Sequence, residues 1–318
     1  MPPPDDPSGD GRRREAAHRA ADDGTAPSRR RRADECEGAL VLIGGACSPH
    51  GPALGAFLDL CRGRDGGRIV GFTTASGDPE ASAHAWLHDF AVAGARNVEI
   101  PIVDRRSRAQ DARIADLVRA ADGIFLGGGD QVHLVATLGG SRVGRAIREA
   151  YQRGAVVGGT SAGAAALTET IMAGGERDEH GEIVDLYTGP GFGLLGFRAV
   201  IDTHFAERRR LHRLFVAIAN NPELMGLGID EDTALVVRGH LARVHGPGGV
   251  TFVDGRGVRF DTANEAQRPG VGLTLSYLRV GIVGAGYDFN LRERELELLL
   301  EEAEEKEPTP TVKGTEAR

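Results

Sequence analysis

One serine in this chain stands in a context that could make its hydroxyl a nucleophile. Residues 159–163 read Gly-Thr-Ser-Ala-Gly and fit the pattern G-x-S-x-G, with Ser161 at the centre. The apolar residues 155–157 before it are an expected strand, and the small residues of 162–170 are an expected helix. In such a strand–turn–helix the serine sits on a tight turn with its hydroxyl exposed above the sheet. The amide of Ala162, at the start of the helix, could then stabilise an oxyanion.

Histidine is the usual base beside such a serine, because a serine hydroxyl is a weak nucleophile until a base accepts its proton. The chain has ten histidines. His204 is the best candidate, since it follows Val200-Ile201 at an expected strand end, where the sites of α/β proteins collect. His212 competes, but it lies inside an expected helix over 206–219. A hydrogen-bonded structural histidine is the alternative interpretation of His204.

A carboxylate should orient the imidazole as the third member of such a set. Asp230, Glu231 and Asp232 directly follow the short apolar segment 227–229. Their spacing does not choose among the three acids. A polar turn with no chemical role is the alternative interpretation of all three.

A second glycine loop follows another expected strand, in residues 123–131, which read Gly-Ile-Phe-Leu-Gly-Gly-Gly-Asp-Gln. Three glycines allow the backbone to approach a ligand closely. A backbone amide here could be a second oxyanion donor, with Gln131 as a polar positioning group. A phosphate-binding turn or simple tight packing are the alternatives, but neither G-x-G-x-x-G nor G-x-x-x-x-G-K-[ST] fits this loop.

Four arginines crowd the segment after His204, namely Arg208, Arg209, Arg210 and Arg213. A guanidinium group matches a carboxylate with two parallel hydrogen bonds, so the cluster could hold an acidic ligand. The alternative is a solvated face of a helix.

The segments that must position these residues alternate between strand-like and helix-like patterns of apolar residues. Short apolar runs bounded by glycine are expected strands, and helical stretches separate several of them. This alternation predicts an α/β fold with a mostly parallel sheet flanked by helices on both faces. The second half is richer in short strands, which predicts antiparallel hairpins added at a sheet edge. The expected strands are 39–43, 69–73, 98–102, 123–126, 155–157, 235–237, 241–244 and 250–253, and the expected helices also include 52–62, 79–93, 110–121 and 131–150.

The domain organisation follows from changes in composition along the chain. Residues 1–37 contain almost no large apolar residue, so we expect a disordered tail. Residues 38–290 are expected to form one catalytic α/β domain. Residues 291–305 predict an amphipathic C-terminal helix, and 306–318 a flexible tail.

Composition excludes several classes of function. The chain has 318 residues and a net charge of −8, which argues against a nucleic-acid-binding protein. No stretch of about 18 apolar residues is present, which argues against a membrane span. Cys36, Cys47 and Cys61 form neither a disulfide framework nor a zinc site, and free thiols suit a reducing compartment, so we expect a cytoplasmic protein without a metal.

With these blocks in order, residues 38–290 resemble the cyanophycinase family. These serine peptidases are related to aspartyl dipeptidase (peptidase E), on a fold similar to that of class I glutamine amidotransferases. The resemblance rests on four blocks that occur in the expected order: Gly128-Gly-Asp-Gln131, Gly159-Thr-Ser-Ala-Gly163, Asp202-Thr-His-Phe205 with the arginines after it, and Gly228-Ile-Asp-Glu-Asp-Thr-Ala234.

The resemblance assigns roles to individual residues. It implies Ser161 as nucleophile, His204 as base and Glu231 as the orienting acid. Gly129 and Ala162 would donate to the oxyanion. The implied substrate-binding residues are Gln131, Asp202, Thr203, Arg208, Arg210 and Arg213.

The resemblance also implies an activity. The family cleaves cyanophycin, a poly-aspartate backbone that carries arginine on its side chains, into β-Asp-Arg dipeptides, with no metal or organic cofactor. Family precedent suggests a homodimer. The family usually has glutamine where this chain has Thr203 and often has arginine where it has His133, so a related aspartyl or β-aspartyl peptide is an alternative substrate.

Other functions remain open on the sequence. An α/β-hydrolase esterase also uses G-x-S-x-G, but its order along the chain is serine, acid, histidine. Here the best acid follows the best histidine, and no HGGG-type segment is present. A non-catalytic, amidotransferase-like binding module is a second alternative. Glutamine amidotransfer would need a cysteine where Ser161 stands.

Overall fold

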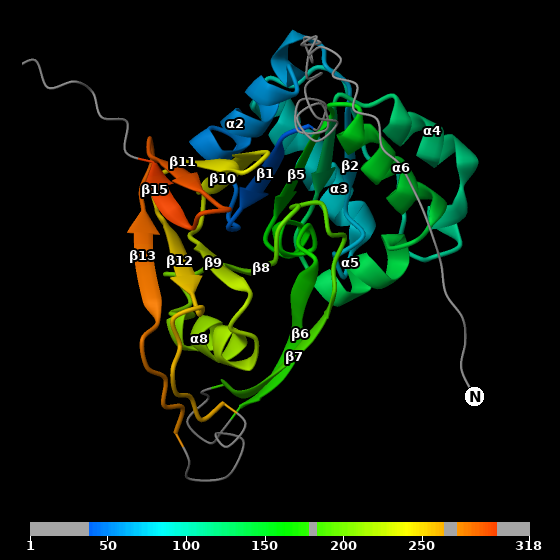
Figure 1. The fold of residues 1–318 in the computed structure, drawn as a ribbon. Helices are drawn as coiled ribbons and strands as arrows, with labels where there is room; N and C mark the ends of the chain where they lie inside the picture. Colours follow the sequence, from blue (N-terminus) through cyan, green and yellow to red (C-terminus); the bar gives the residue numbers. More distant parts are fainter. Residues whose placement is uncertain (1–37, 178–182, 264–271, 298–318) are drawn as a thin grey trace, which may run out of the picture. The chain divides into compact units, whose positions relative to one another are not determined.

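Short, wholly buried apolar runs build the central sheet. The computed structural model describes residues 38–177, 183–263 and 272–297, so the expected tails and residues 298–305 of the expected C-terminal helix lie outside the described part. Strands in the order β1-β5-β4-β2-β3 are parallel and form one side of a nine-stranded sheet (Figure 1). Their bounds are β1 Leu40–Ile43, β2 Ile69–Phe72, β3 Val98–Glu99, β4 Gly123–Leu126 and β5 Val156–Thr160.

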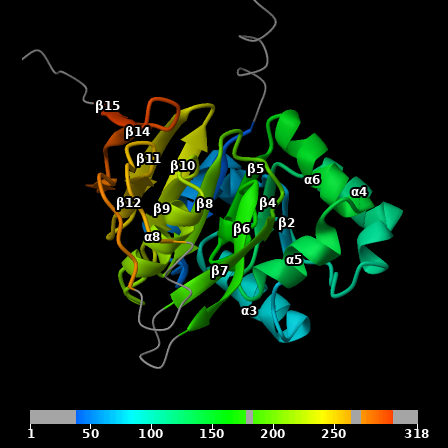
Figure 2. The ribbon, with the colours of Figure 1, turned by 60° about the horizontal axis from the view of Figure 1, so that its bottom comes forward.

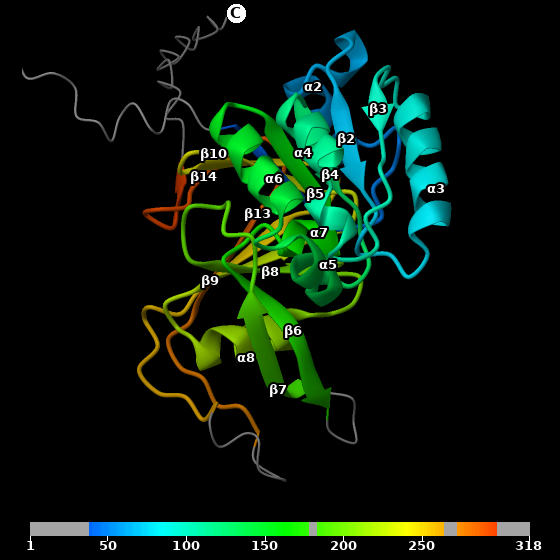
Figure 3. The same cartoon turned by 90° about the vertical axis from the view of Figure 1, so that its right-hand side faces the viewer.

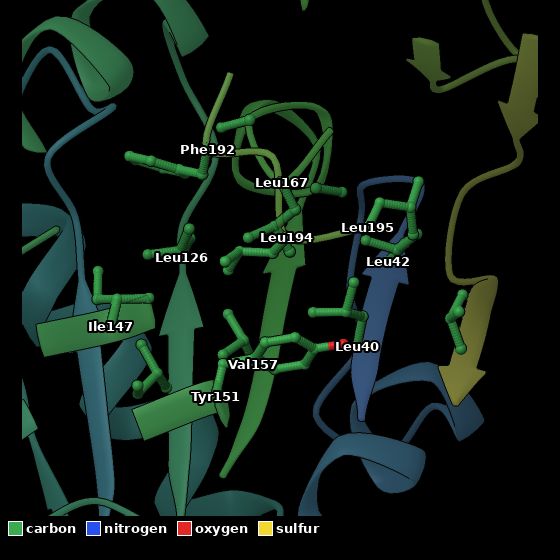
Figure 4. Packing of buried hydrophobic residues seen from close by; sticks show 14 of the residues in the cluster. Leu40, Leu42, Leu126, Ile147, Tyr151, Val157, Leu167, Phe192, Leu194 and Leu195 are labelled. Carbon is green, nitrogen blue, oxygen red and sulfur yellow. The ribbon is translucent and has the colours of Figure 1, made fainter. Parts of the chain in front are cut away.

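Helices cover both faces of the parallel strands (Figure 3), which confirms the expected α/β class. On one face, Leu40 and Val157 pack in one buried cluster with Ile147 (Figure 4). On the other face, Val41 packs in a second cluster with Phe57. Neighbouring residues of one strand therefore pack against the helices on opposite faces of the sheet. The helices are α2 Pro52–Leu60, α3 Pro79–Val92, α4 Ala112–Arg119, α5 Gln131–Leu138, α6 Arg142–Gln152, α7 Ala162–Ala165 and α8 Leu211–Asn220.

Several expected helices are shorter than predicted. The helix expected over 131–150 is two helices, because Gly140 has φ +64° and Ser141 caps α6 by accepting from the Gly144 amide. The expected helix 162–170 ends at Ala165. In each case a turn with its own hydrogen bonds replaces the helical continuation.

The expected hairpin of 235–237 and 241–244 is confirmed at the edge of the central sheet. Strand β10 pairs antiparallel with β1, and β11, β14 and β15 continue outward from β10. The bounds are β10 Ala234–Arg238, β11 Leu241–His245, β14 Asp288–Asn290 and β15 Glu295–Glu297.

A second sheet, absent from the sequence prediction, has the order β13-β12-β9-β8. The expected strand 250–253 lies in this sheet and not at the edge of the first. Strands β8 and β9 are parallel, and the other pairs are antiparallel. The hairpin β6–β7 lies between α8 and α5 (Figure 2). The bounds are β6 Thr170–Arg177, β7 Ile183–Pro190, β8 Ala199–Thr203, β9 Met225–Ile229, β12 Val250–Asp254 and β13 Arg279–Val283.

The prediction of a C-terminal helix over 291–305 is wrong for residues 291–297, the part that the structure describes. Residues 291–294 form a turn, and 295–297 form strand β15. The side chain of Asn290 accepts from the amides of Arg292 and Glu293, and Arg294 has φ +61°, so the local hydrogen bonds favour a turn.

The described helices include none that is long and apolar enough to cross a bilayer. Within the same residues, no group of three or more histidine, cysteine or carboxylate side chains is arranged to hold a metal ion.

An ion cluster around the buried carboxylate of Asp254 joins the second sheet to the turn before β15. Asp254, with 8% of its side chain exposed, pairs with Arg256 and Arg294. Arg294 also donates to the carbonyl of Glu223. Burial by itself raises the pKa of Asp254, but hydrogen bonds from Arg256 and Arg294 outweigh it and lower the pKa from 3.8 to about 2.

We predict that Asp254→Asn lowers the free energy of unfolding by about 2 kcal/mol at neutral pH. Because the folded pKa lies below the unfolded one, the contribution is present above about pH 4 and is lost as the pH falls toward about 2. Urea unfolding of both proteins across this range measures the difference. A difference that does not narrow in acid would contradict the assignment.

Candidate active site

The nucleophile candidate lies on the turn between β5 and α7. Ser161 has φ +53° and ψ −117°, in the left-handed half of backbone space that a non-glycine residue rarely enters. A Cβ on Gly163 would lie 2.1 Å from the carbonyl oxygen of Leu126, so the start of α7 packs directly on β4. The sequence needs small residues here because backbone meets backbone.

The base candidate follows β8 and reaches back to this turn. The Nε2 atom of His204 lies 3.0 Å from the Oγ of Ser161. His204 also has a positive φ, of 51°, and 13% of its side chain is exposed. The competitor His212 is the second residue of α8.

The three adjacent acids have three different sets of partners. The Oε1 atom of Glu231 lies 2.6 Å from the Nδ1 of His204. Asp230 accepts from two backbone amides, and Asp232 accepts from the amide of Ser48. These distances allow an N–H at Nδ1 to donate to Glu231 and the Nε2 atom to accept from the Ser161 hydroxyl, and only one of the three acids contacts His204.

One short backbone segment connects the loops that carry these residues. The carbonyls of residues 43–45, which leave the end of β1, accept in order from the amides of Ser161, His204 and Asp232, at 2.9, 2.6 and 2.9 Å. The three loops that carry Ser161, His204 and the adjacent acids are thus bonded to the same three-residue segment. Sequence reasoning missed this segment, although two glycines directly after an apolar strand were its visible signal.

Gly45 also forms the wall against which the imidazole rests. It has φ +112°, and a Cβ at this position would lie 2.2 Å from the Cε1 atom of His204. No side chain fits between this backbone and the ring. The glycine is required both by its conformation and by the close approach.

The expected oxyanion donors lie on the two segments around Ser161. A Cβ on Gly128 would lie 3.3 Å from the Cβ of Ser161, so the glycine loop contacts the serine turn. Gly129 follows with φ +135°. Among the described residues, no backbone carbonyl accepts from the amides of Gly129 or Ala162. Neither N–H group is therefore used by the backbone of the described residues.

Gln131 and His133 lie at the start of α5 with defined partners. The Nε2 of Gln131 donates to the carbonyl of Met172 at 2.6 Å and so connects α5 with β6. The Nε2 of His133 lies 3.2 Å from the carbonyl oxygen of Asp104. Both side chains thus bond to backbone carbonyls of neighbouring segments.

Two of the four arginines surround one buried carboxylate. Asp202, whose side chain is fully buried, pairs with Arg210 and Arg213. Arg210 also donates to the carbonyl of Thr203 at 2.7 Å, and the Thr203 residue is only 6% exposed. Burial lowers the pKa of Arg210, the cations Arg213 and Arg208 lower it further, and Asp202 opposes them. The group carries two positive charges against one negative charge.

Arg208 differs from its neighbours. It is exposed, and within the described residues it forms no ion pair with a carboxylate. Its backbone amide donates to the carbonyl of His204 at 3.0 Å, which keeps it within one turn of the base. This guanidinium group is available to an incoming ligand.

A hydroxyl, an imidazole and a carboxylate in hydrogen-bond contact at the ends of parallel strands define a class of protein, the hydrolases with an activated serine. The match to a known family is more specific. The sequence model of peptidase family S51 matches residues 40–245. The chain belongs to this family, and it is a serine peptidase.

Relatives confirm the expected cyanophycinase family. The cyanophycinase of Geminocystis herdmanii (strain PCC 6308) is 32% identical over 257 residues, which cover 79% of this chain and 93% of the relative. That of Synechococcus elongatus is 36% identical over 264 residues, 77% and 80% of the two chains. The crystal structure of a peptidase from an acI-B1 Actinobacterium has the same fold, with a TM-score of 0.60 and 21% identity over 80% of this chain and 97% of that one.

We predict that Gly45→Ala disables the site without unfolding the protein. The added methyl group would occupy the position of the imidazole ring, so the rate at which a fluorophosphonate labels the protein should fall by at least ~10-fold. Gly55→Ala is the matched control, because there the nearest atom would lie 3.8 Å from the added methyl group and alanine favours the helix. Equal labelling rates in the two variants would show that the ring does not depend on this contact.

Proposed function

We propose that the chain is a serine-type exopeptidase that hydrolyses cyanophycin or a related aspartyl or β-aspartyl peptide. The observation that carries the proposal is the pair of contacts at His204, 3.0 Å to Ser161 and 2.6 Å to Glu231. The relatives at 32% and 36% identity are cyanophycinases, which supports the substrate class.

The first chemical step is acylation. The Oγ of Ser161 attacks the substrate carbonyl carbon while its proton passes to the Nε2 of His204. Glu231, held at Nδ1, stabilises the imidazolium that forms. The amides of Gly129 and Ala162 donate to the oxyanion, whose collapse breaks the C–N bond as His204 returns the proton to the leaving amine.

The second step is deacylation. A water molecule gives a proton to His204 and attacks the acyl carbon. The ester bond to Ser161 breaks, the serine recovers its proton, and the carboxylic acid product leaves. Both steps use the same three side chains, and as written neither step uses a metal or an organic cofactor.

The arginines give the proposed site its preference for acidic peptides. The Asp202–Arg210–Arg213 group retains a net positive charge, and Arg208 is unpaired among the described residues. A substrate carboxylate next to the scissile bond would neutralise this positive charge. Thr203 is buried and shorter than the usual family glutamine, so it offers less contact to the arginine arm of cyanophycin.

The alternative functions receive less support. A glutamine amidotransferase needs a reactive thiol, but burial raises the pKa of both Cys47 and Cys61 to about 12. An α/β-hydrolase would have its acid before its histidine in the chain. A non-catalytic binding module would not need the contacts at His204.

We predict that Ser161→Ala lowers peptidase activity by at least ~10³-fold, the usual loss on removing a nucleophile, with the fold unchanged. Mass spectrometry of fluorophosphonate-treated protein should find one adduct, on Ser161. Activity is measured with cyanophycin and a panel of β-aspartyl dipeptides. Unchanged turnover in the variant, or a wild-type protein that no fluorophosphonate labels, would refute the proposed mechanism.

We predict that Arg208→Ala raises KM for an acidic peptide by about 10-fold and changes kcat little, because it removes a charge-assisted contact to the substrate. Arg113→Ala, at an exposed arginine on α4, is the matched control and should leave KM unchanged. Steady-state kinetics on the best dipeptide of the panel measure both constants. A loss in kcat with constant KM would place Arg208 outside the binding contact.

A further inference from the structure

Two turns of the site hold each other by a reciprocal pair of hydrogen bonds. The amide of Ala206 donates to the Oδ1 of Asp230 at 3.0 Å. In the opposite direction, the amide of Glu231 donates to the carboxylate of Glu207, with both oxygens at 3.3 Å. Each turn thus supplies one side-chain acceptor and one backbone donor to the other.

Regular sheet pairing ends just before these two turns. The parallel pairing of β8 with β9 stops at Thr203 and Ile229, one residue before His204. Beyond that point the chain turns sharply, and both His204 and Asp232 have positive φ values. Backbone hydrogen bonds to the carbonyls of Gly44, Gly45 and Ile229 hold the two turns, but among the described residues none of them satisfies the amide of Glu231. That amide needs an acceptor of its own.

We infer that Glu207 is a positioning residue for the triad acid, an inference that rests on the proposed function. Glu207 holds the peptide group of Glu231, and this fixes the carboxylate 2.6 Å from the Nδ1 of His204. Glu207 touches no reacting atom. It acts through the backbone of its neighbour across the turn.

Glu207 and Asp230 differ in the other hydrogen bonds that their carboxylates accept. Asp230 also accepts from the amide of Gly249 at 2.9 Å, so its loss would loosen a further loop. The side chain of Glu207 is exposed, and its hydrogen bonds within the described chain go to the Glu231 amide alone. A change at Glu207 therefore tests positioning with little effect on the fold.

The test uses a fluorophosphonate, whose reaction with Ser161 is balanced without a substrate. The serine oxygen forms a bond to phosphorus, the P–F bond breaks, His204 accepts the serine proton and fluoride leaves. Saturation kinetics separate the maximal labelling rate, kinact, from the binding constant, KI. This separation distinguishes a misplaced acid from a lost binding contact.

We expect Glu207→Ala to lower kinact by about 5- to 10-fold with KI and Tm unchanged, because small displacements of a catalytic group are costly. Glu207→Gln keeps an acceptor oxygen and should stay within about 2-fold of wild type. Glu99→Ala, an exposed glutamate on β3, is the control without effect.

The outcomes distinguish a failure of the proposed function from a failure of the positioning role of Glu207. If Ser161→Ala is still labelled at the wild-type rate, the proposed function fails. If Ser161→Ala is not labelled but Glu207→Ala has a wild-type kinact, the positioning role fails. A glutamine variant as slow as the alanine variant would also overturn it, because the hydrogen bond would then not be the cause. A change in KI alone would instead place Glu207 in the binding contact.

Discussion

Three successive carbonyl groups at the end of β1 are the constraint on which the site depends. They bond to the amides of Ser161, His204 and Asp232, residues that are far apart in the sequence and come from both sheets. Strand β1 can do this because it lies between parallel β5 and antiparallel β10 and is wholly buried. Hydrogen bonds to a buried, doubly paired strand are hard to displace, so the strand sets the coordinates of the site.

The sequence indicated some parts of this arrangement well, because their signals are local. The turn at Ser161 needs an apolar strand before it and small residues after it, and both are visible in adjacent positions. The strand end before His204 is equally local. Glu231 is different: three acids in a row look alike, and only the resemblance to a family singled it out. In the fold the three are distinguished by partners such as Ser48 and Gly249, which no local pattern reveals.

The errors have the same origin. The second sheet depends on pairing between β9 and β12, which are separated by two other strands, so its existence is not encoded in either strand alone. The segment 291–305 has an amphipathic pattern as a whole, yet in residues 291–297 the pairing of β15 with β14 and the turn at Asn290 take precedence. The burial of Asp202 was likewise not visible in the sequence, although its two arginine partners were.

The enclosure of Asp202 has an entropic consequence for recognition. An arginine side chain on a free surface loses much of its rotational freedom when it grips an anion, and that loss weakens binding. Arg210 and Arg213 have already lost it, because the buried carboxylate immobilises their guanidinium groups before any ligand arrives. In the proposed binding of an acidic peptide, the ligand would meet guanidinium groups that are already immobile, so the entropic cost of ordering them is part of folding and not of binding.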